Sequence, residues 1–177
     1  MNAVVIRPEA IGDRLAIADV VERAFGSPAE ARLVEAIRAS PEYIAELALV
    51  AIVDDRVVGH VMISRCTLVD GDTECGIVML APLAVDRSHQ GRGVGSALVQ
   101  AACGGADEQG EPIVVLEGDP RYYSRFGFGP AAEHGITLPL PDWAPPAAAQ
   151  VIRLSHDDPT MRGTVVYPGS FDVLDET

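Results

Sequence analysis

The sequence has 177 residues, 48% of them hydrophobic, which suits one domain of ordinary size. Asp and Glu number 26 against 13 Lys and Arg, so the net charge is −13. A surface of this charge repels nucleic-acid phosphates and anionic membranes, and it argues against both as partners. The same charge would attract cationic amines, although a contribution to solubility explains it equally well.

The N-terminus lacks the basic start and apolar stretch of a secretory signal, and no run reaches the roughly 18 apolar residues of a membrane span. These features predict a soluble, cytoplasmic protein. The cysteines at 66, 75 and 103 form an odd set without CxxC spacing. They predict neither a disulfide framework nor a zinc site.

The first 40 residues predict a short strand followed by two helices. Residues 3–7, AVVIR, are mostly apolar and predict this strand, which Pro8 closes. Residues 11–25 carry apolar side chains at helical intervals, with Ile11, Leu15 and Ala18 on one face. Ser27 before Pro28 is typical of an N-cap and first turn, so a second helix is expected over 29–39.

The pattern then changes to that of β-strands. Residues 46–53 and 56–66 are rich in Val and Ile, and Asp54 and Asp55 between them predict a tight hairpin turn. Turn-forming residues at 69–72 precede a third strand over 73–85. An antiparallel sheet is expected from these three segments.

After a glycine-rich segment, Val94 begins a helix with one apolar face, and Gly104 and Gly105 are expected to end it. Residues 112–117 predict a buried strand, which is reached by a helical crossover and so lies parallel to a neighbour. The region from 129 onward is rich in proline, and only 150–154 and 164–168 resemble strands.

The segment QGRGVGS, residues 90–96, lies where a strand ends and a helix begins. A helix N-terminus presents unpaired N–H groups that favour an anion. Three glycines let a diphosphate approach the backbone, and Arg92 adds a cation. A plain flexible turn is the alternative interpretation of the glycines alone.

Spacing excludes two other phosphate motifs. A Walker A loop requires lysine, which is absent from this segment. A GxGxxG fingerprint requires glycine at 96 or 98, where the sequence has Ser96 and Leu98. The remaining pattern is Gln-x-x-Gly-x-Gly, formed by Gln90, Gly93 and Gly95.

This pattern, with the order of strands and helices from 3 to about 128, resembles the GNAT superfamily of N-acetyltransferases. The segments LAPLAVD, QGRGVGSAL, LEGDPRYYSRFGF and TVVYPGSF are similar to those of a bacterial subgroup, the YhbS-like predicted acetyltransferases. The resemblance implies an α/β (α+β) fold with a mixed central sheet and helices on both faces. It also implies a single domain over 1–177, with its core at about 3–128 and a proline-rich extension at about 129–177.

In this family the strand before the glycine loop binds the pantetheine arm of acetyl-CoA through its backbone, and the loop binds the pyrophosphate. Carried over to this sequence, the strand residues are Leu83, Ala84 and Val85. The loop residues are Gln90, Gly91, Arg92, Gly93, Val94, Gly95 and Ser96. Many members have an asparagine after the next strand, but this sequence has Glu117-Gly118-Asp119-Pro120 there, so it departs from the family at this cofactor contact.

Tyr123 occupies the place of a family tyrosine that protonates the departing CoA thiolate. A phenol with a pKa near 10 is protonated at neutral pH and can donate. Neighbouring residues on a short helix point about 100° apart, so Tyr122 and Tyr123 cannot both face the thiol. Without the glycine loop, both rings would be interpreted as core aromatics.

Glu117 is the first candidate for the general base that deprotonates the amine, because it ends the strand beside the expected thioester. A solvated surface charge is the alternative role. Other groups that could act through a water are Glu46, His60, Glu74 and Asp119.

The expected reaction is direct transfer of acetyl from acetyl-CoA to a primary amine of a small molecule or protein, without a metal. A CoA-binding sensor or interaction module without catalysis and an enzyme for longer acyl groups are the rival hypotheses. The sequence does not name the acceptor, and it leaves a homodimer open.

Overall fold

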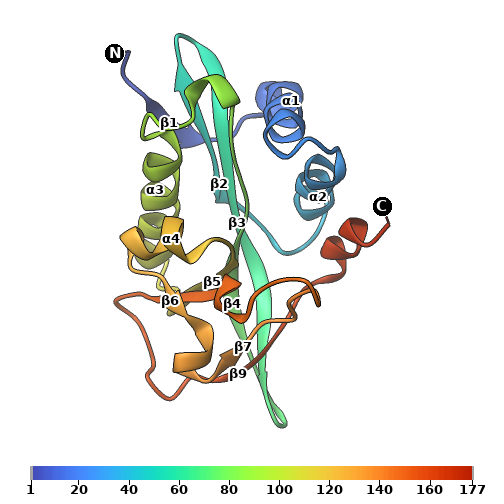
Figure 1. The fold of residues 1–177 in the computed structure, drawn as a ribbon, viewed down its shortest axis with the longest axis vertical. Helices are drawn as coiled ribbons and strands as arrows, with labels where there is room; N and C mark the ends of the chain where they lie inside the picture. The colour runs from blue at the N-terminus through green and yellow to red at the C-terminus, as the bar shows by residue number, and fades with distance from the viewer. Residues whose placement is uncertain (1, 177) are drawn as a thin grey trace.

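The computed structural model describes residues 2–176 and contains one mixed sheet (Figure 1). Met1 and Thr177, which fall within the predicted domain, lie outside the described residues. Nine strands of the described chain join this sheet. They are β1 (Val5–Pro8), β2 (Tyr43–Val53), β3 (Arg56–Asp70), β4 (Thr73–Val85), β5 (Ile113–Glu117), β6 (Gly129–Pro130), β7 (Ile136–Thr137), β8 (Ala149–Arg153) and β9 (Gly163–Val166).

The α-helices of the described chain lie between these strands in sequence. They are α1 (Arg14–Phe25), α2 (Ala29–Arg38), α3 (Val94–Glu108) and α4 (Pro120–Tyr123). A 3₁₀ helix, η6 (Gly169–Leu174), follows β9. No helix within residues 2–176 is long and apolar enough to cross a membrane.

The strand order is β1-β2-β3-β4-β5-β8-β6, with β9 pairing with both β3 and β7. β1 to β4 are antiparallel neighbours, whereas β4 and β5 are parallel. The parallel pair results from the crossover through α3, as predicted. The expected mixed sheet is therefore confirmed.

The predicted hairpin between β2 and β3 is present, and its two aspartates adopt left-handed conformations, with φ of 50° at Asp54 and 60° at Asp55. Both strands are longer than predicted. The sequence predicts Val69 and Asp70 in the next turn, but they pair with Glu74 and Thr73 in the ladder between β3 and β4. This prediction was wrong, and the turn consists of Gly71 and Asp72 alone.

The predicted end of α3 was also wrong, because the helix passes through Gly104 and Gly105 and ends at Glu108. The glycine at 105 has a packing reason. A Cβ built there would lie 2.8 Å from Cδ2 of Leu47 on β2, so a larger residue would force Leu47 or the helix to shift. Gly104 has no such neighbour within 4 Å.

Helices cover both faces of the sheet, with α3 on one side and α1 and α2 on the other (Figure 1). The α1/α2 face buries Ile17, Val21 and Ile37 against alternate residues of the central strands. The α3 face buries Leu98 and Ala102 against the other set. This alternation along each strand decides on which side of the sheet a functional side chain lies.

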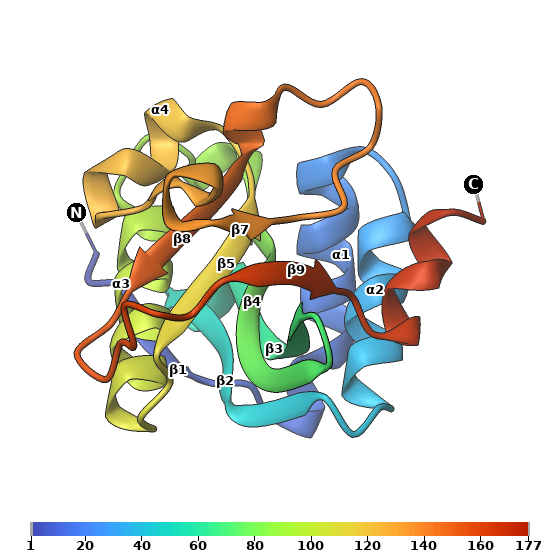
Figure 2. The ribbon, with the colours of Figure 1, turned by 90° about the horizontal axis from the view of Figure 1, so that it is seen from below.

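The C-terminal segment returns to the α1/α2 side of the sheet. After β9 it forms η6, which lies beside α2 (Figure 2), and Phe171 is buried in the core of that face. The strand predicted at 150–154 corresponds to β8, which begins and ends one residue earlier. The strand predicted at 164–168 corresponds to β9, which begins one residue earlier and ends two residues earlier.

Candidate active site

The strands β4 and β5 are paired only over a short stretch. Val78 pairs with Val114 and Met79 pairs with Val115, and no later register pair joins the two strands. β4 nevertheless continues to Val85, paired with β3 alone on its other side. We call the region where β4 and β5 run on without pairing the splay.

A β-bulge marks the point where β4 leaves β5. Val61 of β3 pairs with Leu83 of β4, and the next register pair is Ile63 with Leu80. Between these pairs β3 has one residue and β4 has two. The extra residue falls at Ala81–Pro82, and proline has no N–H to donate to a ladder. The bulge thus ends one stretch of β4 and begins another, which lines the splay.

The backbone direction of the second stretch follows from one hydrogen bond. The N–H of Asp86 donates to the carbonyl of Val58 on β3, at 2.8 Å. Backbone groups of successive strand residues point to opposite edges. Those of Ala84 therefore face β3, whereas those of Leu83 and Val85 face the splay.

The glycine loop is tied to the same strand. The side-chain amide of Gln90 donates to the carbonyl of Val85, at 3.1 Å, so this side chain holds the loop against β4. Gly91 and Gly93 have φ of 71° and 84°, which favours glycine. A Cβ added to either would meet no atom within 4 Å, so the outer side of the loop is open.

The start of α3 presents free donors. The first helical hydrogen bond runs from the N–H of Ala97 to the carbonyl of Gly93, at 3.0 Å. The N–H groups of Val94, Gly95 and Ser96 precede it and have no acceptor within the helix. Arg92 is exposed and lines a hollow of about 160 Å³ next to this turn. The arrangement suits an anion.

Two tyrosines of the segment around α4 approach this region from the α3 face. The hydroxyl of Tyr122 lies against Gly95 and leaves no room for a Cβ at residue 95. The ring of Tyr123 packs instead against Gly118, at the end of β5. The two rings meet edge to face, with centroids 4.9 Å apart. As expected, they point to different places.

The environment of Tyr123 keeps its hydroxyl protonated. Burial raises the pKa of Tyr123 well above its ordinary value of 10, and the nearby Tyr122 and Cys103 add to the rise. The hydroxyl is therefore a proton donor at every pH near neutrality.

Glu117 lies across the sheet from these tyrosines. Along β5, Ile113 and Val115 belong to the α1/α2 face, and Val114 and Leu116 to the α3 face. Alternation places Glu117 on the α1/α2 side. There its carboxylate accepts a hydrogen bond from the hydroxyl of a residue beyond β9, Tyr167.

The other candidate bases occupy different environments. Glu46 and Glu74 are exposed. Asp119 accepts hydrogen bonds from the backbone and side chain of Arg121 and caps the short α4. His60 is fully buried on β3. No group of three or more His, Cys, Asp or Glu side chains in the described part of the chain could hold a metal.

A family model for the acetyltransferase (GNAT) domain matches residues 5–131. The chain is 38% identical to the uncharacterized N-acetyltransferase YhbS of Escherichia coli K12 over 153 residues, which are 86% of this chain and 88% of YhbS. It is 35% identical to YjhQ of the same organism over 71% of this chain and 70% of YjhQ. The chain belongs to the GNAT acetyltransferase family.

Solved structures agree with this assignment. The Escherichia coli YhbS structure in complex with CoA has a TM-score of 0.87 and 34% identity, covering 97% of this chain and 93% of that one. A GNAT acetyltransferase from Brucella melitensis in complex with acetyl-CoA has a TM-score of 0.77 and 29% identity, covering 97% and 100%. The chain is thus an acyltransferase of the GNAT fold.

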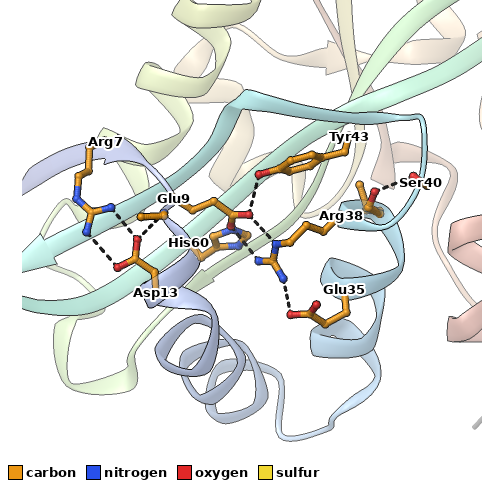
Figure 3. Close-up of polar contacts among 10 residues, drawn as sticks. Arg7, Glu9, Asp13, Glu35, Arg38, Ser40, Tyr43 and His60 are labelled. Atoms are coloured by element: carbon orange, nitrogen blue, oxygen red, sulfur yellow. Dashed lines mark hydrogen bonds and ion pairs between the residues drawn. The ribbon is translucent and has the colours of Figure 1, made fainter.

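In this GNAT chain His60 belongs to a buried ionic cluster (Figure 3). Its Nε2 lies 2.9 Å from one oxygen of Glu9, whose other oxygen accepts from Arg38 at 2.7 Å and from Tyr43 at 2.9 Å. The side chains of Glu9 and Arg38 are each only 4% exposed. His60 Nδ1 is buried without a partner in the described chain.

The cluster perturbs the acidity of its members. Burial alone would raise the pKa of Glu9, but hydrogen bonds from His60, Arg38 and Tyr43 lower it to about 2. Burial also lowers the pKa of His60 below 6.5, so its ring is neutral at pH 7. The geometry therefore gives His60 a part in the core under α1 and α2, not a place at the splay.

The structure brings Val85, the start of α3 and Tyr122 together, and it places Tyr123 against Gly118 at the end of β5. Glu117 lies on the opposite face of the sheet. Sequence reasoning missed the contact of Tyr122 with α3 and the partnership of Tyr167 with Glu117. A signal for the buried cluster existed, because His60 is a polar residue within an apolar strand segment.

Proposed function

We propose that this GNAT protein transfers acetyl directly from acetyl-CoA to a primary amine at the splay of its sheet. The observation that carries the proposal is the unpaired edge of β4 beyond Met79, flanked by the open N-terminus of α3 and by Tyr123. The CoA and acetyl-CoA complexes of the two similar structures support the choice of cosubstrate.

The residues present fit acetyl-CoA. Leu83 directs its backbone N–H and carbonyl into the splay, where the amides of the pantetheine arm need partners. Val85 offers its N–H, because its carbonyl already accepts a hydrogen bond from Gln90. The backbone of Ala84 faces β3, so we expect a smaller part for it. The free N–H groups at residues 94–96 and the cation of Arg92 suit the pyrophosphate, and Gly91 and Gly93 leave the loop open for it. Gln90 acts by bracing Val85.

Bound acetyl-CoA would supply an activated acetyl thioester. Glu117 takes a proton from the amine, whose nitrogen forms a bond to the acetyl carbon as the carbon–sulfur bond breaks. A backbone N–H on β4 polarises the carbonyl, and Tyr123 donates its proton to the departing sulfur. The transfer itself needs no metal, because a thioester is already reactive toward an amine held next to it.

The two proton-transfer groups lie on opposite faces of the sheet. Tyr123 lies on the α3 face and Glu117 on the α1/α2 face. If the amine attacks the acetyl carbon from the α1/α2 side, the CoA thiolate leaves toward the α3 face, where Tyr123 lies. We therefore propose that the acceptor enters from that side.

The remaining predictions concern the protein as a whole. A cytoplasmic location, a single domain over 1–177 and a homodimer stay predictions, and the net charge of −13 disfavours nucleic acids and anionic membranes as partners.

The proposal is tested by following release of the CoA thiol from acetyl-CoA in a panel of primary amines. The panel contains lysine, a polyamine, an aminoglycoside and a peptide with a free N-terminus. We expect thiol release matched mole for mole by acetylated amine, with at least one member. Propionyl- and succinyl-CoA in parallel reactions define the acyl preference. Binding of acetyl-CoA by calorimetry with no release on any amine would contradict the proposal and favour a CoA-binding module.

A further inference from the structure

The C-terminal segment supplies a side chain to the candidate site. Tyr167 follows β9, and its hydroxyl donates a hydrogen bond to Oε1 of Glu117, 50 residues earlier. Both side chains lie on the α1/α2 side of the sheet. Tyr167 is outside the part of the chain that the GNAT family model matches, residues 5–131.

Packing fixes Tyr167 in place. Its ring lies against that of Phe171, with centroids 5.3 Å apart, and Phe171 is buried in the core beside α2. Burial raises the pKa of Tyr167, and the hydrogen bond to Glu117 raises it further. The hydroxyl therefore keeps its proton and always acts as the donor in this pair.

The arrangement leaves one carboxylate oxygen for chemistry. Within residues 2–176, Tyr167 is the only group that hydrogen-bonds the Glu117 carboxylate, and it engages Oε1. A carboxylate oxygen has two lone pairs and the carboxylate is free to turn unless something holds it. Because the two oxygens share one rigid carboxylate plane, a hydrogen bond that holds Oε1 also fixes the direction in which Oε2 points.

Solvent reaches the other side of Tyr167. The residue lines a groove of about 350 Å³, together with Glu42 and Arg65. The groove lies at the edge of β3, between the start of β2 and the end of β9. Tyr167 therefore contacts both a solvent-open groove and the proposed base.

We propose that Tyr167 is a positioning residue for Glu117: its hydroxyl holds Oε1 so that Oε2 receives the proton of the acceptor amine. The inference rests on the proposed function, because it takes Glu117 as the base. The C-terminal segment thereby becomes part of the active site.

The test is a double-mutant cycle on the full chain, with acetyl-CoA and the most active amine of the panel. Tyr167→Phe keeps the ring and removes the hydroxyl. We expect kcat to fall about tenfold with the KM for acetyl-CoA changed less than about twofold. Glu117→Gln should cost more, and the double variant should equal Glu117→Gln alone.

Melting temperature and acetyl-CoA affinity, measured for each variant, separate positioning from a loss of fold. Glu117→Asp is the second variant: it keeps the carboxylate but withdraws it from the hydroxyl, and it should lose kcat about as much as Tyr167→Phe.

The two failures are distinguishable. If Glu117→Gln keeps wild-type turnover, Glu117 is not the general base, and both that part of the proposed function and this inference are wrong. A full tenfold loss from Tyr167→Phe in the Glu117→Gln background would show that Tyr167 acts independently, and this would overturn the inference alone. Unchanged turnover in Tyr167→Phe would overturn it as well.

Discussion

Met79 and Val115 form the last register pair between β4 and β5. Before this pair the two strands are parallel neighbours in the sheet, and after it each keeps only its outer partner. Because buried backbone groups require hydrogen-bond partners, a strand edge left open inside a fold invites a ligand with amides of its own. The pantetheine arm of acetyl-CoA is such a ligand.

The first prediction concerns amide exchange along β4. Acetyl-CoA should slow the exchange of the Leu83 and Val85 N–H groups, because both face the splay. The Ala84 N–H faces β3 and should change little, which makes it an internal control. Residue-resolved hydrogen exchange with and without acetyl-CoA checks this. Equal protection of all three amides, or of none, would contradict the proposed binding edge.

The second prediction concerns the buried cluster around Glu9. Replacing Glu9 by Gln leaves the guanidinium of Arg38, 4% exposed, without its buried counter-charge. We expect a loss of about 3–5 kcal/mol in the free energy of unfolding at pH 7, measured by urea denaturation. Glu35→Gln is the matched control, since Glu35 contacts the same Arg38 but is 53% exposed. It should cost less than about 1 kcal/mol, and equal losses would refute the role of burial.

The cluster also predicts the direction of the pH dependence. Glu9 has a folded pKa of about 2 against an ordinary value of 4.5, so its contribution to stability is full above 4.5 and is lost as the pH falls toward 2. The pKa of His60 is lowered in the fold, so the unfolded chain takes up a proton first as the pH falls below 6.5. Stability should decline on acidification from pH 7, and the loss below pH 4.5 should be smaller in Glu9→Gln.

The third prediction separates two adjacent glycines of α3. Gly104→Ala should stabilise the protein by about 0.5–1 kcal/mol, because alanine is the better helix former and no neighbour lies within 4 Å. Gly105→Ala should give no such gain, because its methyl group would meet buried Leu47 at 2.8 Å. Thermal unfolding of the two variants checks this, and an equal gain from both would show that the helix is not held so close to β2.

These glycines illustrate what local sequence signals can predict. Periodicity and turn residues located the first two helices, the hairpin at Asp54 and Asp55, and the crossover to a parallel strand. The apolar face predicted for the first helix was wrong, because Ile11 and Leu15 are exposed and Ile17 and Val21 are buried instead. A glycine pair looks like a helix end in isolation. Only the approach of Leu47 from another strand explains why Gly105 lies within the helix. Tertiary packing decided this point.

The candidate site divides in the same way. The glycine loop and the tyrosine segment are contiguous motifs, and spacing and resemblance sufficed to find them. Tyr167 and Glu117 are 50 residues apart and come together only because the C-terminal segment returns to the α1/α2 face. The backbone direction of Ala84 likewise depends on the register with β3, which residue types do not encode.

The most direct test of the account is one comparison of wild type and Tyr123→Phe, measuring acetyl-CoA affinity by calorimetry and thiol release with the most active amine. Removing the hydroxyl keeps the ring that packs against Gly118 but removes the proton for the departing thiolate. The account predicts acetyl-CoA binding within about twofold of wild type and turnover lower by at least about tenfold. Unchanged turnover in Tyr123→Phe would contradict it.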